Sequence, residues 1–420
     1  MQDNEKKPAL RFKGFTDPWE QRKLDEEFDF TVPNNTLSRA ELNQESGSVR
    51  NVHYGDVLIK YGSVLDVQND ELPFITGRSK DDFKGALLQN GDIIIADTAE
   101  DETTGKVCEI VNIQDKDVVA GLHTMVCRPK NKTAEGYFGY YMNSSSYHHQ
   151  LLPLMQGIKV LSLSKTNVQK TTVKYPKDKA EQQKIADCLR RIDTLITLHQ
   201  RKYEKLLNIK KSMLDKMFPQ NGVSVPEIRF KGFTDPWEQR KISELAEKTY
   251  GGGTPTTSNE AFWNGNIPWI QSSDIVDGKL MGVEPRKYIT QTGLNSSATQ
   301  LVPKDSIAII TRVGVGKLAY MPFSYSTSQD FLSLSKLNTE PFFTVYACYK
   351  KLQSELNTVQ GTSIKGITKD ELLAKTISVP VYSEQKQIGS FFTQLDTLIT
   401  LHQREHIKPI LEVKRVKRNE

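Results

Sequence analysis

Several residue groups in the sequence resemble catalytic motifs, but each lacks a part that its chemistry requires. Gly314-Val315-Gly316-Lys317 carries the Gly-Lys pair of a phosphate-binding P-loop, which also needs a hydroxyl residue next and an earlier glycine. Leu318 follows instead, and Thr311 stands where that glycine belongs. Asp17-Pro18-Trp19 and Asp235-Pro236-Trp237 lack the second proline of the box with which base N-methyltransferases hold an amino group. We therefore expect neither nucleotide hydrolysis nor base methylation by this chain.

Side chains that could bind a metal or act as nucleophiles are scattered along the sequence. No His-Glu-x-x-His zinc motif and no Gly-x-Ser-x-Gly elbow occurs. His148-His149 is typical of a solvated turn, and acidic pairs such as Asp101-Glu102 are typical of an exposed surface. No Cys-x-x-Cys pair exists among Cys108, Cys127, Cys188 and Cys348. The pattern predicts a protein without catalytic or metal-binding residues, in a reducing cytoplasm.

What remains is binding, and the loops carry the side chains that nucleic-acid recognition uses. Bases are read by side chains with paired donors and acceptors, and phosphates by Lys, Arg, Ser, Thr and amides beside glycine. In the second half of the chain the candidates are Thr254, Ser272, Ser273, Arg312, Gly314, Gly316, Lys317, Gln329, Asp330, Thr362, Ser363 and Lys365. In the first half, matched places give Thr98, Lys106, His123 and Lys159, and residue chemistry alone adds Lys60, Tyr61, Ser63 and Arg78. For each of them, a solvated loop residue is the alternative.

Composition permits this interpretation without requiring it. The 420 residues include 56 Lys or Arg and 51 Asp or Glu, which gives a net charge of +5 and a pI of about 8.7. Lys205, Lys210, Lys211 and Lys216 lie where they either face DNA phosphates or only keep a helix soluble. The mean hydropathy is -0.50, and no apolar run approaches the ~20 residues of a membrane-spanning helix. Residues 1–8 lack the apolar core of a signal peptide, so we expect no membrane partner.

An internal duplication organises the chain. Residues 11–23 and 229–241 both read RFKGFTDPWEQRK. Residues 181–201 and 384–404 form a second related pair, whose last nine residues are identical. The repeat is far longer than the 20–50 residues of solenoid repeats, so the chain consists of two tandem halves.

The two middle regions differ in sequence but share a rhythm. Residues 87–96 and 301–310 have the same apolar pattern, and each half later places a Ser/Thr-Lys pair before a strand-like stretch that ends in proline. Short β-branched runs between Gly, Pro, Asn and Asp predict strands, and helical patches lie near Ala134–Tyr147 and Thr344–Thr358. The strands are expected at 57–59, 93–95, 107–111 and 307–310. The pattern indicates that both middle regions have the same α+β fold, with a mixed and mostly antiparallel sheet. Each copy of this fold carries a different surface.

A change of period after Pro176 and Pro380 predicts a long helix in each half. Apolar residues from Ile185 to Leu206 step by four and three, as in a heptad seam, and a helix over 181–217 would be about 55 Å long. The second copy repeats the seam from Ile388 to His402. Each helix needs a partner for its apolar face, and we expect the two copies to pair antiparallel. The alternative is that each helix packs on its own domain, and the two seam histidines are expected to be packing residues.

In its two opening boxes and its two long helices, the chain resembles the specificity subunit of type I restriction–modification systems. The resemblance extends to Gly252-Gly253-Thr254-Pro255, residues 263–270 and residues 360–367, and it covers nearly the whole chain. It implies target recognition domains at 1–180 and 220–383, each reading one half of a split DNA sequence. It also implies a central helix at 181–219 that acts as a spacer and docks subunits, and a C-terminal helix with a basic tail at 384–420.

The resemblance further implies the partners. They are double-stranded DNA, two modification subunits that use S-adenosylmethionine to methylate adenine at N6, and restriction subunits that use ATP and Mg²⁺ to cleave DNA. This chain would hold no cofactor. Because the two middle regions differ, the DNA target is expected to be asymmetric. The chain departs from the family pattern at Pro409, which is expected to kink or end the second helix.

Two other functions remain as alternatives. One is a nuclease with a degenerate site, which would bind Mg²⁺ through a carboxylate pair. The other is a scaffold that assembles proteins through its coiled coil without DNA, with partner binding that is insensitive to salt.

Overall fold

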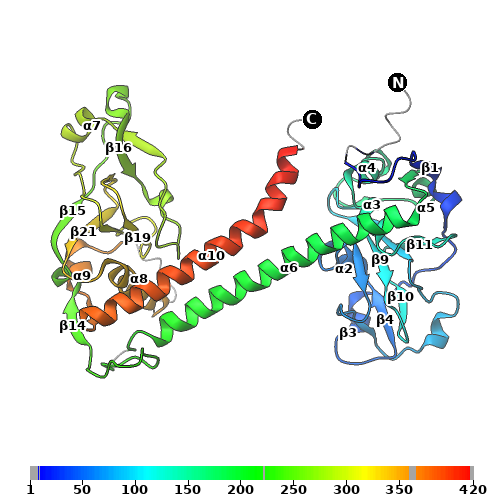
Figure 1. Cartoon of the computed structure of the whole chain (residues 1–420), viewed down its shortest axis with the longest axis horizontal. Coiled ribbons are helices and arrows are strands. Elements are labelled where there is room, and N and C mark those ends of the chain that lie inside the picture. Colours follow the sequence, from blue (N-terminus) through cyan, green and yellow to red (C-terminus); the bar gives the residue numbers. More distant parts are fainter. Residues whose placement is uncertain (1–7, 9, 221–222, 359–365, 417–420) are drawn as a thin grey trace. The chain divides into compact units, whose positions relative to one another are not determined.

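The computed structural model describes residues 8, 10–220, 223–358 and 366–416, with side chains placed as far as Gln403 except at 357–358 (Figure 1). The chain divides into two compact units, residues 1–195 (unit 1) and 196–420 (unit 2). One long helix, α6 (Lys179–Lys216), begins in unit 1 and ends in unit 2. Over the described residues, no helix is long and apolar enough to cross a membrane.

Unit 1 is built on a five-stranded sheet of order β2-β11-β7-β9-β5 and a four-stranded sheet of order β10-β4-β6-β3. Only the β5–β9 and β10–β4 pairings are parallel, which confirms the expected mixed, mostly antiparallel sheet. The ribbons β1–β13 and β12–β8 complete the unit. Its strands are β1 (Glu20–Lys23), β2 (Phe28–Asp29), β3 (Leu42–Asn43), β4 (Val49–Val52), β5 (Val64–Asp66), β6 (Phe74–Ile75), β7 (Ile93–Ala96), β8 (Thr98–Ala99), β9 (Val107–Val111), β10 (Asp117–Ala120), β11 (Thr124–Pro129), β12 (Leu161–Ser162) and β13 (Thr172–Tyr175).

The short helices of unit 1 correct one expectation. They are α1 (Leu24–Glu27), α2 (Tyr54–Ile59), α3 (Tyr137–Met142), α4 (Ser145–His148) and α5 (Lys165–Gln169). Residues 57–59 were expected to form a strand, but they end α2 instead. His53 caps this helix by accepting a hydrogen bond from the Gly55 N–H, and local capping of this kind outweighs β-branched propensity. The other expected strands lie within β7, β9 and β18.

Unit 2 repeats the plan with a four-stranded antiparallel sheet of order β15-β21-β18-β19 and a three-stranded sheet of order β17-β16-β20. The ribbon β14–β22 matches the ribbon β1–β13 of unit 1. The strands are β14 (Glu238–Lys241), β15 (Ala246–Gly251), β16 (Trp263–Ile270), β17 (Lys287–Ile289), β18 (Ser306–Ile310), β19 (Leu318–Met321), β20 (Ser326–Thr327), β21 (Phe331–Leu337) and β22 (Thr376–Val379). The helices are α7 (Gln291–Asn295), α8 (Pro341–Thr358), α9 (Lys369–Ala374) and α10 (Tyr382–Val416).

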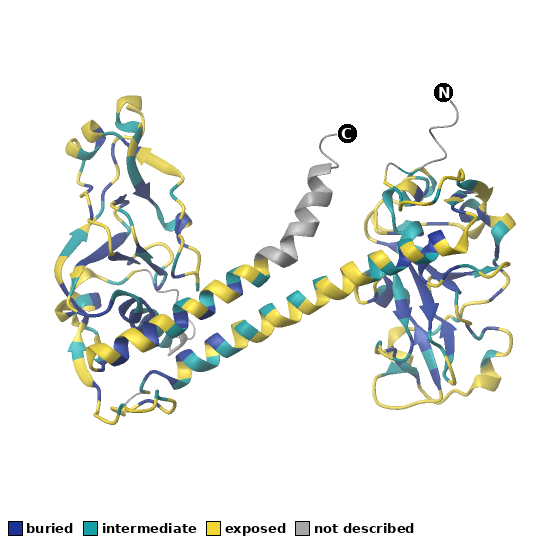
Figure 2. Ribbon diagram, viewed as in Figure 1, coloured by how far each residue is buried: buried dark blue, intermediate teal, exposed yellow. Residues whose placement is uncertain are grey.

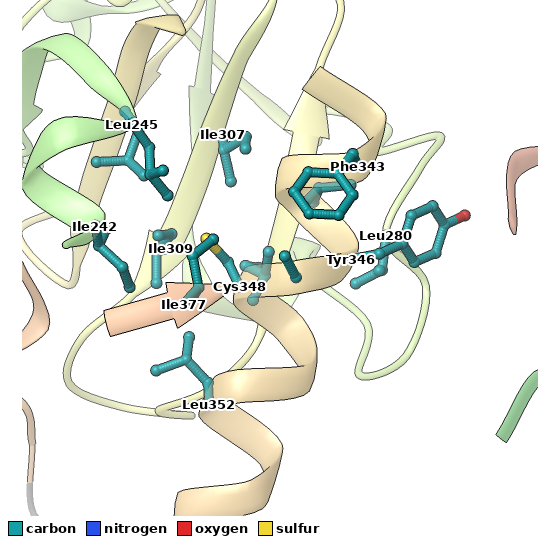
Figure 3. Packing of buried hydrophobic residues seen from close by; sticks show 14 of the residues in the cluster. Ile242, Leu245, Leu280, Ile307, Ile309, Phe343, Tyr346, Cys348, Leu352 and Ile377 are labelled. Carbon is teal, nitrogen blue, oxygen red and sulfur yellow. The ribbon is translucent and has the colours of Figure 1, made fainter. Parts of the chain in front are cut away.

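The central strand of each unit is buried on both faces. In β18, Ile307 and Ile309 pack on one side with Phe343 of α8, as Figure 3 shows, whereas Ala308 and Ile310 pack on the other side. In β7, Ile93 and Ile95 lie in one core cluster and Ile94 and Ala96 in another. Successive residues of a strand face opposite sides, so a continuous apolar run is what such a strand needs. This explains why residues 87–96 and 301–310 share a pattern.

The repeated sequences form a repeated anchor at the start of each long helix. Arg11 binds Glu181 through two hydrogen bonds of 2.7 Å, and Arg229 binds Glu384 at 2.7 and 2.8 Å. Both carboxylates are buried, and such bidentate pairs are the strongest ion pairs that proteins make. The opening boxes are therefore identical because each one holds the first turn of a long helix.

Within unit 2, α10 pairs with the second half of α6. His199 Nδ1 lies 3.0 Å from His402 Nδ1, and Lys210 Nζ lies 2.6 Å from Asp396 Oδ1. Lys210 follows His199 along α6, whereas its partner Asp396 precedes His402 along α10. The two helices therefore run antiparallel. The buried seam of α10 includes Ile388 and Phe392, as expected. Pro409 is expected to kink or end the second helix, and the structure excludes the second of these, since α10 continues through Pro409 to Val416.

Candidate nucleic-acid interface

In unit 1, three chain segments meet at one end of β7. The backbone N–H of Asp97, just after β7, donates to the His123 carbonyl at 3.1 Å, and the Leu163 N–H donates to the Asp97 carbonyl at 2.8 Å. The loop between β7 and β9 closes with the Ala96 N–H donating to Lys106 O at 2.9 Å. We call residues 97–106, 121–123 and 156–163 the unit 1 corner.

The same frame occurs in unit 2. The Thr311 N–H donates to Asp330 O at 2.7 Å, the Ile367 N–H donates to Thr311 O at 2.7 Å, and the Ile310 N–H donates to Lys317 O at 2.9 Å. We call residues 311–317, 328–330 and 366–367 the unit 2 corner. These hydrogen bonds match His123 to Asp330, Lys106 to Lys317 and Leu122 to Gln329. The two corners therefore share a main-chain frame that positions different side chains.

The unit 1 corner holds His123 and Thr98, two of the predicted residues. His123 has a left-handed backbone with φ of 56°, and its exposed ring packs edge-on against Tyr54 at 5.3 Å. Its Nδ1 lies 3.5 Å from an Asp97 carboxylate oxygen and 3.4 Å from Thr98 Oγ1. Three neighbours thus fix an exposed imidazole. No sequence pattern points to Tyr54, because only the fold brings it to His123.

The unit 2 corner is the more basic of the two. Arg312 is exposed, and Lys317 is half-buried beside Gly314, whose φ of 91° only glycine adopts readily. Gly316 has the same φ, and a Cβ at this position would overlap the Leu356 side chain. The unit 1 corner instead exposes the acidic residues 100–102. Cations attract phosphates and carboxylates repel them, so the two corners present opposite charge to a DNA backbone.

Gln329 of the unit 2 corner is paired with Thr254, another predicted residue. The Thr254 hydroxyl donates to Gln329 Oε1 at 2.7 Å. Asp330 also lies in this corner, and its carboxylate accepts a hydrogen bond from the Ser328 hydroxyl at 3.2 Å. Ser272 and Ser273 begin a short 3₁₀ turn after β16, where Asp274 is buried.

Two predicted contact residues of unit 1 make hydrogen bonds inside the domain. Tyr61 is only 4% exposed, its hydroxyl donates to the Glu71 carbonyl, and burial raises its pKa. The Lys106 ammonium donates to the carbonyls of Leu58 and Tyr61 at 2.8 and 3.1 Å, and burial lowers its pKa. The Tyr61 hydroxyl proton and two of the three Lys106 ammonium hydrogens are therefore used inside the domain.

The remaining predicted residues of unit 1 lie on other parts of its surface. Ser63 accepts a hydrogen bond from the Asn143 side chain at 3.0 Å, and Lys60 donates to the Glu71 carbonyl at 2.8 Å. Arg78 is exposed, and Lys159 is exposed on the turn that follows Gly157. Only Lys159 of these belongs to the corner.

Other candidates fall outside the corners or outside the description. Thr362, Ser363 and Lys365 lie outside the described residues. On α6, Lys205 and Lys211 are exposed, as phosphate contacts would need. Lys210 is buried, and it binds Asp396 and the Gly278 carbonyl, so it is not a surface phosphate ligand. Lys216 pairs with Glu227 at 2.7 Å. Within the described part of the chain, no three His, Cys, Asp or Glu side chains form a group that could hold a metal ion.

Comparison with known proteins identifies a family. The family described as Type I restriction modification DNA specificity domain matches residues 16–208 and 234–411. The putative type I restriction enzyme MjaX specificity subunit of Methanocaldococcus jannaschii is 22% identical over 346 residues, which cover 80% of this chain and 78% of that protein. The EcoR124I/EcoR124II specificity subunit of Escherichia coli is 30% identical over 38% of this chain and 41% of its own length. The MjaIX specificity subunit of M. jannaschii is 28% identical over 39% of this chain, an alignment that spans only 38% of that relative.

Solved structures show the same fold. The S subunit of a type I restriction–modification system from M. genitalium aligns over 98% of this chain and 97% of its own, with a TM-score of 0.60 and 15% identity. A chain from a structural study of complex assembly and conformational transition in the type I system aligns over 97% of both chains, with a TM-score of 0.51 and 17% identity. Both support the α+β fold with tandem domains and long helices.

Proposed function

Because the chain belongs to the type I restriction–modification DNA specificity family, we propose that it reads a split, asymmetric DNA sequence on behalf of partner subunits. Each unit reads one half of the target through its corner. The partners supply the chemistry, which is adenine methylation and ATP-dependent cleavage. S-adenosylmethionine, ATP and Mg²⁺ then bind to those partners and not to this chain.

The observation that carries the proposal is the repeated main-chain frame with unlike side chains. The Asp97–His123 and Thr311–Asp330 hydrogen bonds are equivalent, yet one corner presents an imidazole and the other an amide and a guanidinium. Base edges are distinguished by their donor and acceptor patterns, so different side chains on one frame select different bases. Two identical corners would instead fit a palindrome.

The long helices are proposed to set the gap between the half-sites. The helix α6 is anchored at Glu181 in unit 1, and its far end packs into the core of unit 2 through Leu214. A continuous helix fixes both the separation and the rotational phase of whatever is attached to its ends. DNA recognition on one face requires that control, since equivalent grooves recur about every 34 Å.

Two copies of a modification subunit are proposed to dock on the identical nine-residue segments 193–201 and 396–404. Figure 2 shows exposed positions along α6 and along the coloured part of α10. Among these positions, the two segments expose the same leucines. Leu195 and Leu198 are 54% and 45% exposed, and Leu398 and Leu401 are 45% and 48% exposed. Exposed apolar residues that recur at equivalent positions fit two copies of one partner.

The experiment is a methylome. The chain is co-expressed with its modification subunit in a host without adenine methylation, and N6-methyladenine is mapped by single-molecule sequencing. A split, asymmetric motif that is methylated on both strands is the expected result, and the modification subunit alone is the control. A soluble complex that neither methylates DNA nor shifts it in a gel at low salt would refute the proposal.

A further inference from the structure

The pairing of Thr254 with Gln329 is the starting point. Both side chains are exposed, they lie 75 residues apart in the sequence, and the hydroxyl donates to Gln329 Oε1 at 2.7 Å. A free glutamine on a surface samples many rotamers. This one is held by a hydrogen bond from a second side chain.

Two glycines bring Thr254 to that place. A Cβ at Gly252 would overlap the Ser328 carbonyl, and a Cβ at Gly253 would overlap the backbone of Thr299. The Gly253 N–H donates to Thr327 O at 2.9 Å, and the Trp269 indole donates to Gly253 O at 3.0 Å. Only glycine allows this close approach of two backbones. The two glycines therefore place the Thr254 hydroxyl within hydrogen-bond distance of Gln329.

The backbone of Gln329 is equally constrained. The Ser328 N–H donates to Ile270 O at 2.9 Å, and Asp330 is tied to Thr311 by the shared frame of the corner. Both neighbours of Gln329 are therefore fixed in position, and its side chain extends from the surface. An ordered amide of this kind has lost its rotamer entropy before any ligand binds.

We propose that Gln329 is a base-reading residue that recognises an adenine in the DNA major groove, and that Thr254 is its positioning residue. Glutamine pairs with adenine by accepting from N6–H and donating to N7. The hydrogen bond from Thr254 occupies one lone pair of Oε1, which leaves the other lone pair for N6–H and the Nε2 hydrogens for N7. The residue of unit 1 that matches Gln329 is Leu122, whose side chain can neither accept from N6–H nor donate to N7. Only the half-site that unit 2 reads is therefore expected to carry this adenine.

The inference rests on the proposed function, and it is tested with the full chain in complex with its modification subunits. Binding is measured on duplexes in which each base pair of the wild-type target is replaced in turn. Gln329→Glu keeps the shape but loses the donor to N7, and we expect the preference for adenine at one position to fall about 5- to 150-fold. Thr254→Val should reduce the preference at the same position, and Thr254→Ser should restore it. None of these three variants should lower the thermal unfolding midpoint by more than the control variant, Gln239→Glu, does.

The control is Gln239→Glu. Gln239 is also exposed, and it bonds to the Ser378 hydroxyl at 2.6 Å, but it lies on the β14–β22 ribbon away from the corner. Gln239→Glu should leave the base preference at every position of the target unchanged. A loss spread evenly over all positions in Gln329→Glu, or a loss at a base pair without adenine, would overturn the assignment. If the wild-type complex selects no sequence at all, the proposed function itself fails; if it selects a target that Gln329→Glu reads unchanged, only this inference fails.

Discussion

Glu109 is a carboxylate that unit 1 buries in its interior. It accepts hydrogen bonds from the N–H groups of Gly136 and Gly139, at 2.6 and 2.9 Å, and so holds the start of α3. Burial raises its pKa to about 7, and the two N–H bonds offset only part of that rise. The ionised form is therefore tolerated but disfavoured in the folded state.

The raised pKa of Glu109 gives a pH prediction. The folded state binds this proton more tightly than the unfolded state, whose glutamates have a pKa near 4.3. The stabilisation is complete below about pH 4 and is lost as the pH rises through about 7, by at most about 4 kcal/mol. Glu109→Gln should therefore flatten the decrease in unfolding free energy between pH 5 and pH 7.5, as measured by urea titration at several pH values. Parallel wild-type and variant curves would contradict the prediction.

At the scale of elements, a partly buried ion pair contributes to the pairing of α6 with α10. Lys210 and Asp396 are 2.6 Å apart, and Asp396 also accepts a hydrogen bond from the Tyr346 hydroxyl at 2.6 Å. Lys210→Met should destabilise unit 2 by about 1–3 kcal/mol, because it leaves a partly buried carboxylate without its cation. Lys211→Met, one residue along on the exposed side, should change the stability by less than about 0.5 kcal/mol. Calorimetry of the two variants checks this, and equal unfolding temperatures would count against it.

The docking proposal gives a second prediction for the helices. Leu398→Asp should leave the chain folded and should reduce the number of bound modification subunits from two to one. The reason is that a charge cannot enter an apolar interface without a partner. Gln394→Asp, at an exposed position of α10 outside the docking segment, should still bind two. Sedimentation velocity of the complexes gives the stoichiometry, and a full complement on Leu398→Asp would place the docking surface elsewhere.

The sequence predicted helices and repeats better than it predicted contacts. The heptad spacing of Ile388 and Phe392 was enough to place α10, because a period is a local property. The burial of Tyr61 and the pairing of Lys106 with two carbonyls were not predictable, since both depend on parts of the chain far away in the sequence. Thr254 and Gln329 were each predicted as candidates, but only the fold could show that they meet.

At the scale of the whole molecule, each unit has its own sheets and cores, so the two half-sites should be separable by mutation. His123→Ala should change the bases selected in one half of the target and leave the other half as in the wild type. The control is His149→Ala, because His149 is an exposed histidine of unit 1 outside the corner. A methylome of each variant checks this. Changes in both halves, or in neither, would contradict the assignment of one corner to each half.

The hydrogen bonds that hold each corner run between main-chain atoms, so they do not depend on which side chains the corner carries. Substitutions at Thr98, His123, Arg312 or Gln329 should therefore accumulate without loss of expression, whereas changes at Arg11 or Glu181 should be purged because they unseat a helix. Such a protein can acquire a new DNA target by single substitutions, each of which changes one selected base, while it remains folded. Its recognition surface is the part of the molecule in which substitutions are tolerated most readily during evolution.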